Sequence, residues 1–212
     1  MLAQRCLVGA AATSKVLAYV GETNSDTNAT VYTFSAHAVG TASAGRRNIV
    51  AAHAQNGTGG VASMTIGGDS ATELVDAINV SCVAALYIML NTAGTSEDIV
   101  VTFDQAHTTA AVGVWESTGL ADNTALDTDS STAAAPAATL TTTPGGFVVA
   151  ATSNQIGSSS AWSGTGVTER YDDQTGDTGD WSGADAVTTG NSLAITNTIT
   201  SNNRQVGVFA SF

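Results

Sequence analysis

The chain closes with Gln205-Val206-Gly207-Val208-Phe209-Ala210-Ser211-Phe212, the stretch that decides the fold class. Taking every second residue puts both valines, Ala210 and Phe212 on one side. Because successive side chains of a β-strand point to opposite faces, this alternation predicts a strand with its valines and Phe212 packed inward.

The same pattern occurs earlier in the chain, as Val-Gly-Val-Trp-Glu-Ser at residues 112–117, which lies 94 residues before Val-Gly-Val-Phe-Ala-Ser at 206–211 (206 − 112). Two further echoes keep the same order: Val50 aligns with Val149, and Thr72-Glu73 aligns with Thr168-Glu169. Two interpretations follow. Either residues 31–117 and 139–212 are copies of one unit, or the agreement arose by chance in a sequence rich in Val, Ala, Gly and Thr.

Short apolar runs separated by polar turns indicate further strands. A Ser-x-x-Glu capping box at residues 70–73 would favour a helix, but its echo at 166–171 holds Gly and β-branched residues, so we predict a strand or turn there. Residues 121–144, with both prolines, are expected to form an irregular joint. The other predicted strands cover residues 46–54, 81–90, 98–103, 110–116, 147–153, 192–198 and 204–212.

Evenly spaced strands predict an all-β antiparallel sandwich of jelly-roll type, in which two internally similar halves contribute to one core. We expect a single sandwich domain over residues 31–212 and an N-terminal arm over residues 1–30. The side chains expected in the core are Ile88, Val112, Val114, Val148, Val206, Val208 and Phe212.

The composition predicts a thin core and an acidic surface. Hydrophobic residues make up 43% of the chain but aromatic residues only 6%, so most apolar side chains are small. Because small side chains bury little area, association with further copies is expected to add stability. Eighteen acidic residues against six basic ones give a net charge of −12, which argues against nucleic acid as a partner. No apolar run approaches transmembrane length, so no membrane partner is expected.

Two cysteines, Cys6 and Cys82, are too few for a disulfide framework, and Cys82 is expected to be a reduced, buried thiol. The apolar N-terminus resembles a signal peptide only superficially, because its basic residue follows the first apolar ones. We predict instead that it packs on a neighbouring subunit as an assembly arm. The residues expected to supply its buried area are Leu2, Leu7, Val8, Val16 and Leu17.

A Gly-rich acidic loop near residue 176 is the densest polar cluster. Its carboxylates could wrap Ca²⁺, which takes six to eight oxygen ligands, although the spacing is not that of an EF-hand. The alternative is a solvated acidic loop, so no cofactor is otherwise expected. The calcium candidates are Asp172, Asp173, Asp177, Asp180 and Asp185.

Trp162 and Trp181 each begin a Trp-Ser-Gly triplet on either side of this loop. Exposed tryptophans there could stack on sugar rings, as in a carbohydrate-binding module. The alternative is that they cap the sandwich core.

No catalytic motif is present in the sequence. His37, His53 and His107 are scattered singly, without the paired spacing of a zinc site. A Gly-x-Ser-x-Gly elbow and a phosphate-binding loop are also missing. Glycosidase-type carboxylates stay open, because their pairing is spatial. We therefore expect a protein that is not an enzyme, with no catalytic residues.

Several framework motifs resemble β-sandwich structural proteins of tailed bacteriophages. They are the strand Gly-Gly-Phe-Val-Val-Ala-Ala at 145–151, Trp-Ser-Gly at 162–164 with Thr-Glu-Arg-Tyr-Asp at 168–172, Ser-Gly-Ala-Asp at 182–185 and the closing strand. Residues 46–50 and 64–68 resemble the same group. These motifs extend over most of the chain after residue 31.

The resemblance implies a virion component, such as a capsid decoration or cement protein that stabilises the head surface. Its partners would be further copies of itself, for example in a homotrimer, and the major capsid protein or other virion proteins. The expected location is the virion surface, after assembly in the host cytoplasm. The alternatives are a tail or head fibre or adhesin domain, a carbohydrate-binding module, and a secreted surface protein cleaved near residue 12.

Overall fold

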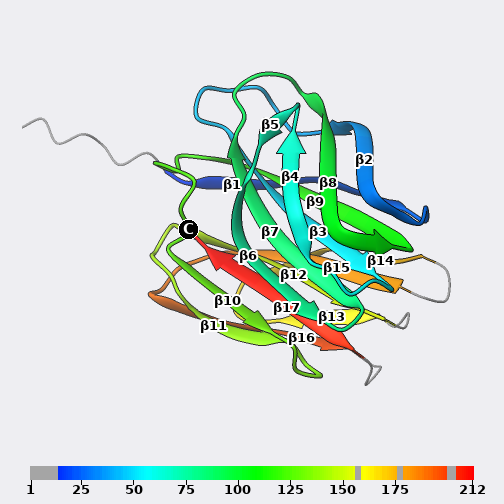
Figure 1. The fold of residues 1–212 in the computed structure, drawn as a ribbon. Coiled ribbons are helices and arrows are strands. Elements are labelled where there is room, and N and C mark those ends of the chain that lie inside the picture. Colours follow the sequence, from blue (N-terminus) through cyan, green and yellow to red (C-terminus); the bar gives the residue numbers. More distant parts are fainter. Residues whose placement is uncertain (1–13, 156–158, 176–178, 200–203) are drawn as a thin grey trace, which may run out of the picture.

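The computed structural model describes residues 14–155, 159–175, 179–199 and 204–212, and within them the chain forms four antiparallel β-sheets and no helix (Figure 1). The first outer sheet has the strand order β2 (Ala29–Ala38), β8 (Ser96–His107), β4 (Val61–Ile66), β5 (Asp69–Ser70). The first central sheet has the order β1 (Val16–Ser25), β9 (Thr109–Thr118), β3 (Arg47–Gln55), β7 (Cys82–Leu90), β6 (Thr72–Asn79).

The second half of the chain forms the other two sheets. The second central sheet has the order β10 (Asp127–Ser131), β17 (Gln205–Ser211), β12 (Phe147–Asn154), β15 (Gly179–Val187), β14 (Val167–Thr175). The second outer sheet has the order β11 (Ala137–Thr141), β16 (Ser192–Ile199), β13 (Ser160–Ser163). The all-β, antiparallel prediction is confirmed.

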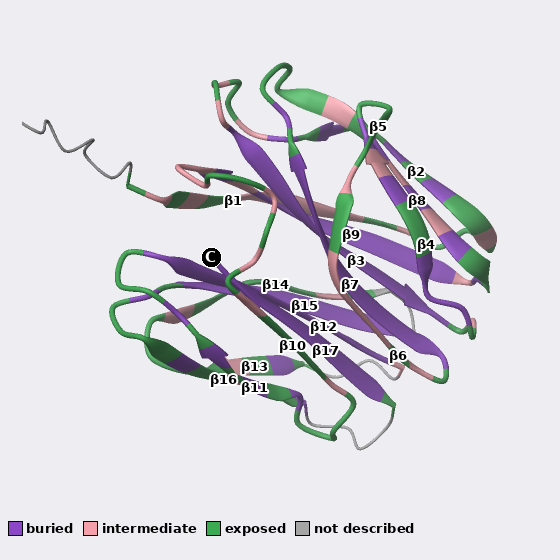
Figure 2. Ribbon diagram, turned by 60° about the vertical axis from the view of Figure 1, so that its left-hand side comes forward, coloured by how far each residue is buried: buried purple, intermediate pink, exposed green. Residues whose placement is uncertain are grey.

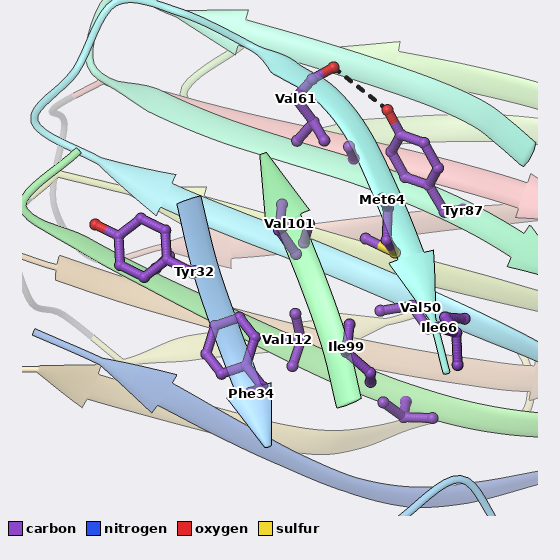
Figure 3. Packing of buried hydrophobic residues seen from close by; sticks show 14 of the residues in the cluster. Tyr32, Phe34, Val50, Val61, Met64, Ile66, Tyr87, Ile99, Val101 and Val112 are labelled. Carbon is purple, nitrogen blue, oxygen red and sulfur yellow. Dashed lines mark hydrogen bonds between the residues drawn. The ribbon is translucent and has the colours of Figure 1, made fainter. Parts of the chain in front are cut away.

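Three hydrophobic cores separate the four layers. The first lies between the first outer and first central sheets, where Tyr32, Phe34 and Met64 pack, and where Tyr87 donates a hydrogen bond to the carbonyl of Val61 (3.3 Å; Figure 3). The second lies between the two central sheets, and the third between the second central and second outer sheets.

The inner strands of the two central sheets are therefore buried on both faces, as their purple ribbons in Figure 2 show; they are β3, β7, β9, β12, β15 and β17. Strands β1, β6 and β10 are partly exposed. Burial of the inner strands explains why hydrophobic residues make up 43% of the chain, because a strand packed on both sides is a nearly continuous apolar run. Small alanines such as Ala51, Ala52 and Ala85 let neighbouring layers approach on both sides. All seven side chains predicted to be in the core are buried.

The echoing valines, however, face different cores. Val112 and Val114 of β9 point into the first core, whereas Val206 and Val208 of β17 point into the core between the central sheets. The valines that the sequence comparison sets opposite one another therefore do not occupy equivalent faces, because a shift of one residue moves every side chain to the other face.

Two segments differ from their predicted form. Val16 and Leu17, expected in an arm, begin β1, which pairs with β9 from Val16 opposite Thr118 to Ser25 opposite Ala110. The other arm residues, Leu2, Leu7 and Val8, lie outside the described residues. The joint over residues 121–144 contains two edge strands, β10 and β11. The sequence did not reveal them, because β10 is polar and β11 is a short segment rich in Ala and Thr.

Candidate functional site

The candidate site is a polar and aromatic cluster between the two central sheets, where β1 and β9 lie over β14 and β15. We call it the junction cluster. Its members are Tyr19, Glu22, His53, Trp115, Ser153, Arg170, Tyr171, Asp173, Trp181 and Asp185.

His53 of β3 lies fully buried at the centre of the junction cluster. Its Nδ1 is 3.0 Å from Ser153 Oγ, and its Nε2 is 2.8 Å from the hydroxyl oxygen of Tyr171. Ser153 Oγ donates its own proton to the carbonyl of Val83 at 2.7 Å, so it accepts from Nδ1–H. Nε2 then accepts from Tyr171. Every proton of this chain of hydrogen bonds has one acceptor.

Burial keeps His53 neutral by lowering its pKa to about 3. Burial also raises the pKa of Tyr171 well above its usual value, so Tyr171 stays a donor. Although Ser153 and His53 are residues that a hydrolase would use, the serine proton points to a carbonyl and both side chains are buried. The pair therefore joins the two sheets.

Two glycines make room for the Tyr171 ring. A Cβ atom on Gly113 of β9 or on Gly183 of β15 would collide with the ring. Tyr171 thus fits into a slot with one wall from each central sheet. Since both glycines interrupt apolar strands, they were the sequence signal for a close approach at this point.

Trp115, Arg170 and Asp185 form the outer part of the junction cluster. Trp115 Nε1 donates to Asp185 Oδ2 at 2.8 Å, and Arg170 binds the same carboxylate with Nε at 2.7 Å and Nη2 at 2.8 Å. Hydrogen bonding to Asp185 raises the pKa of Arg170. Tyr19 packs edge-on against Trp115 and stacks on Tyr171. The distances between ring centroids are 5.5 Å to Trp115 and 5.9 Å to Tyr171.

The edge of the junction cluster carries two acidic residues. Glu22 of β1 is half-buried, and burial, followed by the charge of Asp173, raises its pKa to about 7. Asp173 of β14 accepts a hydrogen bond from Asn24 Nδ2 at 2.9 Å.

The predicted calcium ligands are dispersed over different partners. Asp172 accepts the backbone N–H of Ser160 at 3.0 Å, Asp185 binds Arg170, and Asp180 is buried. Asp177 lies outside the described residues. Within the described part of the chain, no three His, Cys, Asp or Glu side chains are grouped so as to hold a metal ion.

The two tryptophans differ in exposure. Trp181 is 0% exposed and stacks on His53 at 6.4 Å, so it offers no surface for a sugar ring. Trp162 is half-buried; its Nε1 donates to Ser182 Oγ at 2.6 Å, and its ring packs edge-on against Phe209. Only Trp162 keeps a face that a glycan could reach.

The Thr-Glu echo occupies matching places, and in both copies an aspartate follows three residues after the glutamate. A bulge follows Glu73 in β6, and a bulge follows Glu169 in β14. Asp76 lies by the N–H of Val61, the first residue of β4, and Asp172 accepts the N–H of Ser160, the first residue of β13. Each aspartate thus links the edge of a central sheet to an outer sheet. Burial raises the pKa of Asp76 to about 6 and also raises that of Asp172.

Arg46 and Arg47, the adjacent cations of the sequence, bind backbone carbonyls on opposite sides of β3. Arg46 is fully buried and donates to the carbonyls of Asn91 (2.6 Å), Ala93 (2.7 Å) and Gly94 (2.9 Å) and to that of Gly40. Arg47 holds the joint between the halves through the carbonyls of residues 120 and 121 and the side chain of Asn123. The sequence did not reveal these roles.

Cys82 is buried, its Sγ lies 3.0 Å from the carbonyl of Arg204, and burial raises its pKa to about 12. The expected reduced thiol is therefore consistent with its surroundings.

Comparisons with protein-family models, with curated proteins and with solved structures found no match. Among the described residues, no helix is long and apolar enough to cross a membrane.

Proposed function

We propose that this chain is a non-enzymatic structural protein of a virus particle, of the capsid decoration or cement type found in tailed phages. The observation that carries the proposal is that side chains able to act in catalysis are engaged in structural hydrogen bonds. His53, Ser153 and Arg170 all bind groups that hold the sheets together. The net charge of −12 suits a protein that stays soluble until it assembles.

We further propose that each half is a jelly roll. In the first half β1 pairs with β9, β2 with β8, β3 with β7 and β4 with β5, so the pairs are nested like those of one long hairpin. The second half repeats this nesting with β10 and β17, β11 and β16, and β12 and β15. Nested pairs divided between two packed sheets are what a jelly roll requires.

Strand register supports an internal duplication in a corrected alignment. Starting from the bulge after Glu73 and Glu169, the pairing aligns Tyr87 with Ala184, because they lie opposite these glutamates. Continuing across β3 and β12 aligns Val50 with Ala150, and across β9 and β17 aligns Val114 with Phe209. Val50 and Val114 face the first core, and Ala150 and Phe209 face the third, so each pair occupies the inner face of its own half.

The two halves also pack with their strand orders reversed. β6 lies against β17 and β10, while β1 lies against β14. Exchanging the halves exchanges these contacts, which is the arrangement of an isologous two-fold interface. An ancestral dimer fused into one chain accounts for this relation and for the second core, which lies between the two central sheets.

The particle proposal is tested by mass spectrometry of purified virions with copy-number determination. Hundreds of copies per particle support a capsid role, and a few to a few dozen favour a tail or fibre. Absence from particles overturns the proposal. The second candidate, a carbohydrate-binding module or adhesin, is favoured by the exposed part of Trp162, and a glycan array with Trp162→Ala as control tests it.

Association with further copies belongs to the same proposal. Several apolar side chains are exposed, among them Val16 (55%), Leu126 (49%) and Val187 (65%). Together with the apolar residues 1–13 they could contact neighbouring subunits. We expect oligomers in sedimentation velocity, and a chain lacking residues 1–13 should fold yet assemble poorly. A full-length monomer at micromolar concentration would contradict this part.

A further inference from the structure

The N-terminal strand β1 is held by its pairing with β9 and by contacts with β2 and β14. Within its sheet it pairs only with β9. Across the layers it lies on β14, where Tyr19 stacks on Tyr171 (5.9 Å) and Asn24 bonds Asp173 (2.9 Å). The contact with β14 connects β1 with the last third of the chain. A change at this contact therefore alters how firmly β1 is held.

Glu22 sits between these two contacts and has an unusual environment. Its Oε2 atom is buried, and no N–H or hydroxyl group of the described residues donates a hydrogen bond to it. Burial raises the pKa of Glu22 most, and the charge of Asp173 and a hydrogen bond between the two carboxyl groups raise it further. Two carboxyl groups can form such a bond only when one of them is protonated.

The other charged and titratable groups near Glu22 leave this pair uncompensated. Arg170 of β14 is bound through two nitrogens to Asp185 of β15. Tyr19 on β1 itself and Tyr171 on β14 stay neutral, because burial raises the pKa of both. Opposite Glu22, β9 places Gly113, and its own carboxylate, Glu116, pairs with Ala18 further along β1.

We propose that Glu22 keeps its proton between the two central sheets, where it faces Asp173, and that losing this proton loosens β1 from β14. An ionised Glu22 repels the Asp173 carboxylate at the point where Asn24 and Tyr19 hold the strand. Strand β1 would then be held firmly at mildly acidic pH and released at alkaline pH. This inference does not depend on the virion proposal.

The sign follows from linkage. A carboxyl group whose pKa is higher in the docked state than in the open state binds more protons when docked. Docking is therefore strongest below the usual range of a glutamate and weakens as the pH rises through about 7. Above that pH the effect levels off.

Hydrogen–deuterium exchange on the full chain tests the proposal, with rates corrected for intrinsic pH dependence. Between pH 5.5 and 8.5, protection of β1 amides should fall by about tenfold, below the full linkage value because Glu22 is half exposed. Glu22→Gln, which keeps a hydrogen-bonding group without a charge, should abolish this fall. Asp26→Asn, an equal charge change in the exposed turn after β1, should leave it unchanged.

Edge strand β10 supplies an internal reference. The pKa of its Asp127 is lowered, so this carboxylate stays ionised between pH 5.5 and 8.5. The protection of β10 should be the same at both pH values. The proposal is overturned if wild-type β1 shows no pH dependence beyond that of β10, or if Glu22→Gln retains it. If Glu22→Gln fails to fold, Asp173→Asn provides the same test. The comparison of β1 with β10 in the wild-type protein needs no variant and can be made in either case.

Discussion

His53 of β3 and Tyr171 of β14 are joined by a 2.8 Å hydrogen bond that crosses from one central sheet to the other. The two residues are 118 positions apart in the chain. With Ser153 they place a fully hydrogen-bonded polar chain inside an otherwise apolar interface. Such a network specifies one relative position of the sheets, because any slip leaves buried polar atoms without partners.

Removing the Tyr171 hydroxyl should destabilise the protein. Tyr171→Phe leaves His53 Nε2 buried without a donor, which costs about 1–3 kcal/mol. Urea denaturation would measure this loss. Tyr19→Phe is the matched control, because Tyr19 is only half-buried in the same cluster, and it should change stability by less. Equal effects of the two variants would contradict the role given to the hydroxyl.

The slot for Tyr171 should reject a single methyl group. In Gly113→Ala the new Cβ collides with the ring, and such overpacking typically costs about 1–3 kcal/mol. Gly21→Ala in β1 is the control, since nothing lies within 4 Å of a Cβ atom there. Thermal unfolding of both variants would measure this, with a lower Tm expected for Gly113→Ala alone. A neutral Gly113→Ala would mean that the slot is wider than described.

Arg46 should not be replaceable by lysine. Its guanidinium binds four carbonyls in two loops, and an ammonium group can reach only some of them. Losing partners around a buried charge costs about 3–5 kcal/mol, so Arg46→Lys should lower Tm markedly. Arg204→Lys, at an exposed cation with one 3.3 Å side-chain bond, should have little effect. Similar Tm values for the two variants would refute this role.

Acid should weaken the junction cluster through His53. Its pKa is near 6.5 in the unfolded chain and about 3 in the folded protein, so the unfolded state binds more protons between these values. Stability should therefore fall as the pH drops from 6.5 towards 3, by an amount on the order of 4 kcal/mol. Denaturation at several pH values would show this slope. It should diminish in His53→Gln and persist in His37→Gln.

The turn between β6 and β7 should be strained. Ser81 N–H bonds the carbonyl of Asn79 at 2.7 Å across Val80, whose φ is +56°, in the manner of a classic γ-turn. A β-branched residue is disfavoured there, so Val80→Asn should stabilise the protein by about 0.5–1 kcal/mol. Val16→Asn, at an equally exposed valine in a regular strand, should not. Chemical denaturation would measure the free energy of unfolding of both variants, which should rise only in Val80→Asn.

The edges of the second outer sheet should depend on carboxylates. Asp127 accepts the N–H of Thr141 in β11, and Asp172 accepts that of Ser160 in β13. Because unpaired edge N–H groups invite pairing with another chain, Asp127→Ala should increase self-association. Light scattering at neutral pH would detect it, with Asp129→Ala as control. Unchanged scattering would show that the edge is protected by other means.

Local alternation in the sequence was enough to predict most inner strands and seven buried side chains, because side-chain direction in a strand has a period of two. The Thr-Glu echo was also informative, since Glu73 and Glu169 precede matching bulges. Strand β1 was expected to be an arm, and edge strands β10 and β11 were missed because β10 is polar and β11 is short and rich in Ala and Thr.

The face to which each strand turns was decided only in the tertiary structure. A strand buried on both sides has no polar face to mark its direction, so Val112 and Val206 looked equivalent although they enter different cores. The junction cluster depended on the same level of structure, because His53, Trp115, Ser153, Tyr171 and Asp185 come from five strands that meet only when the central sheets stack. The sequence by itself determined most of the inner strands; the stacking of layers determined which residues touch, because contacts across a layer carry no periodic signal along the chain.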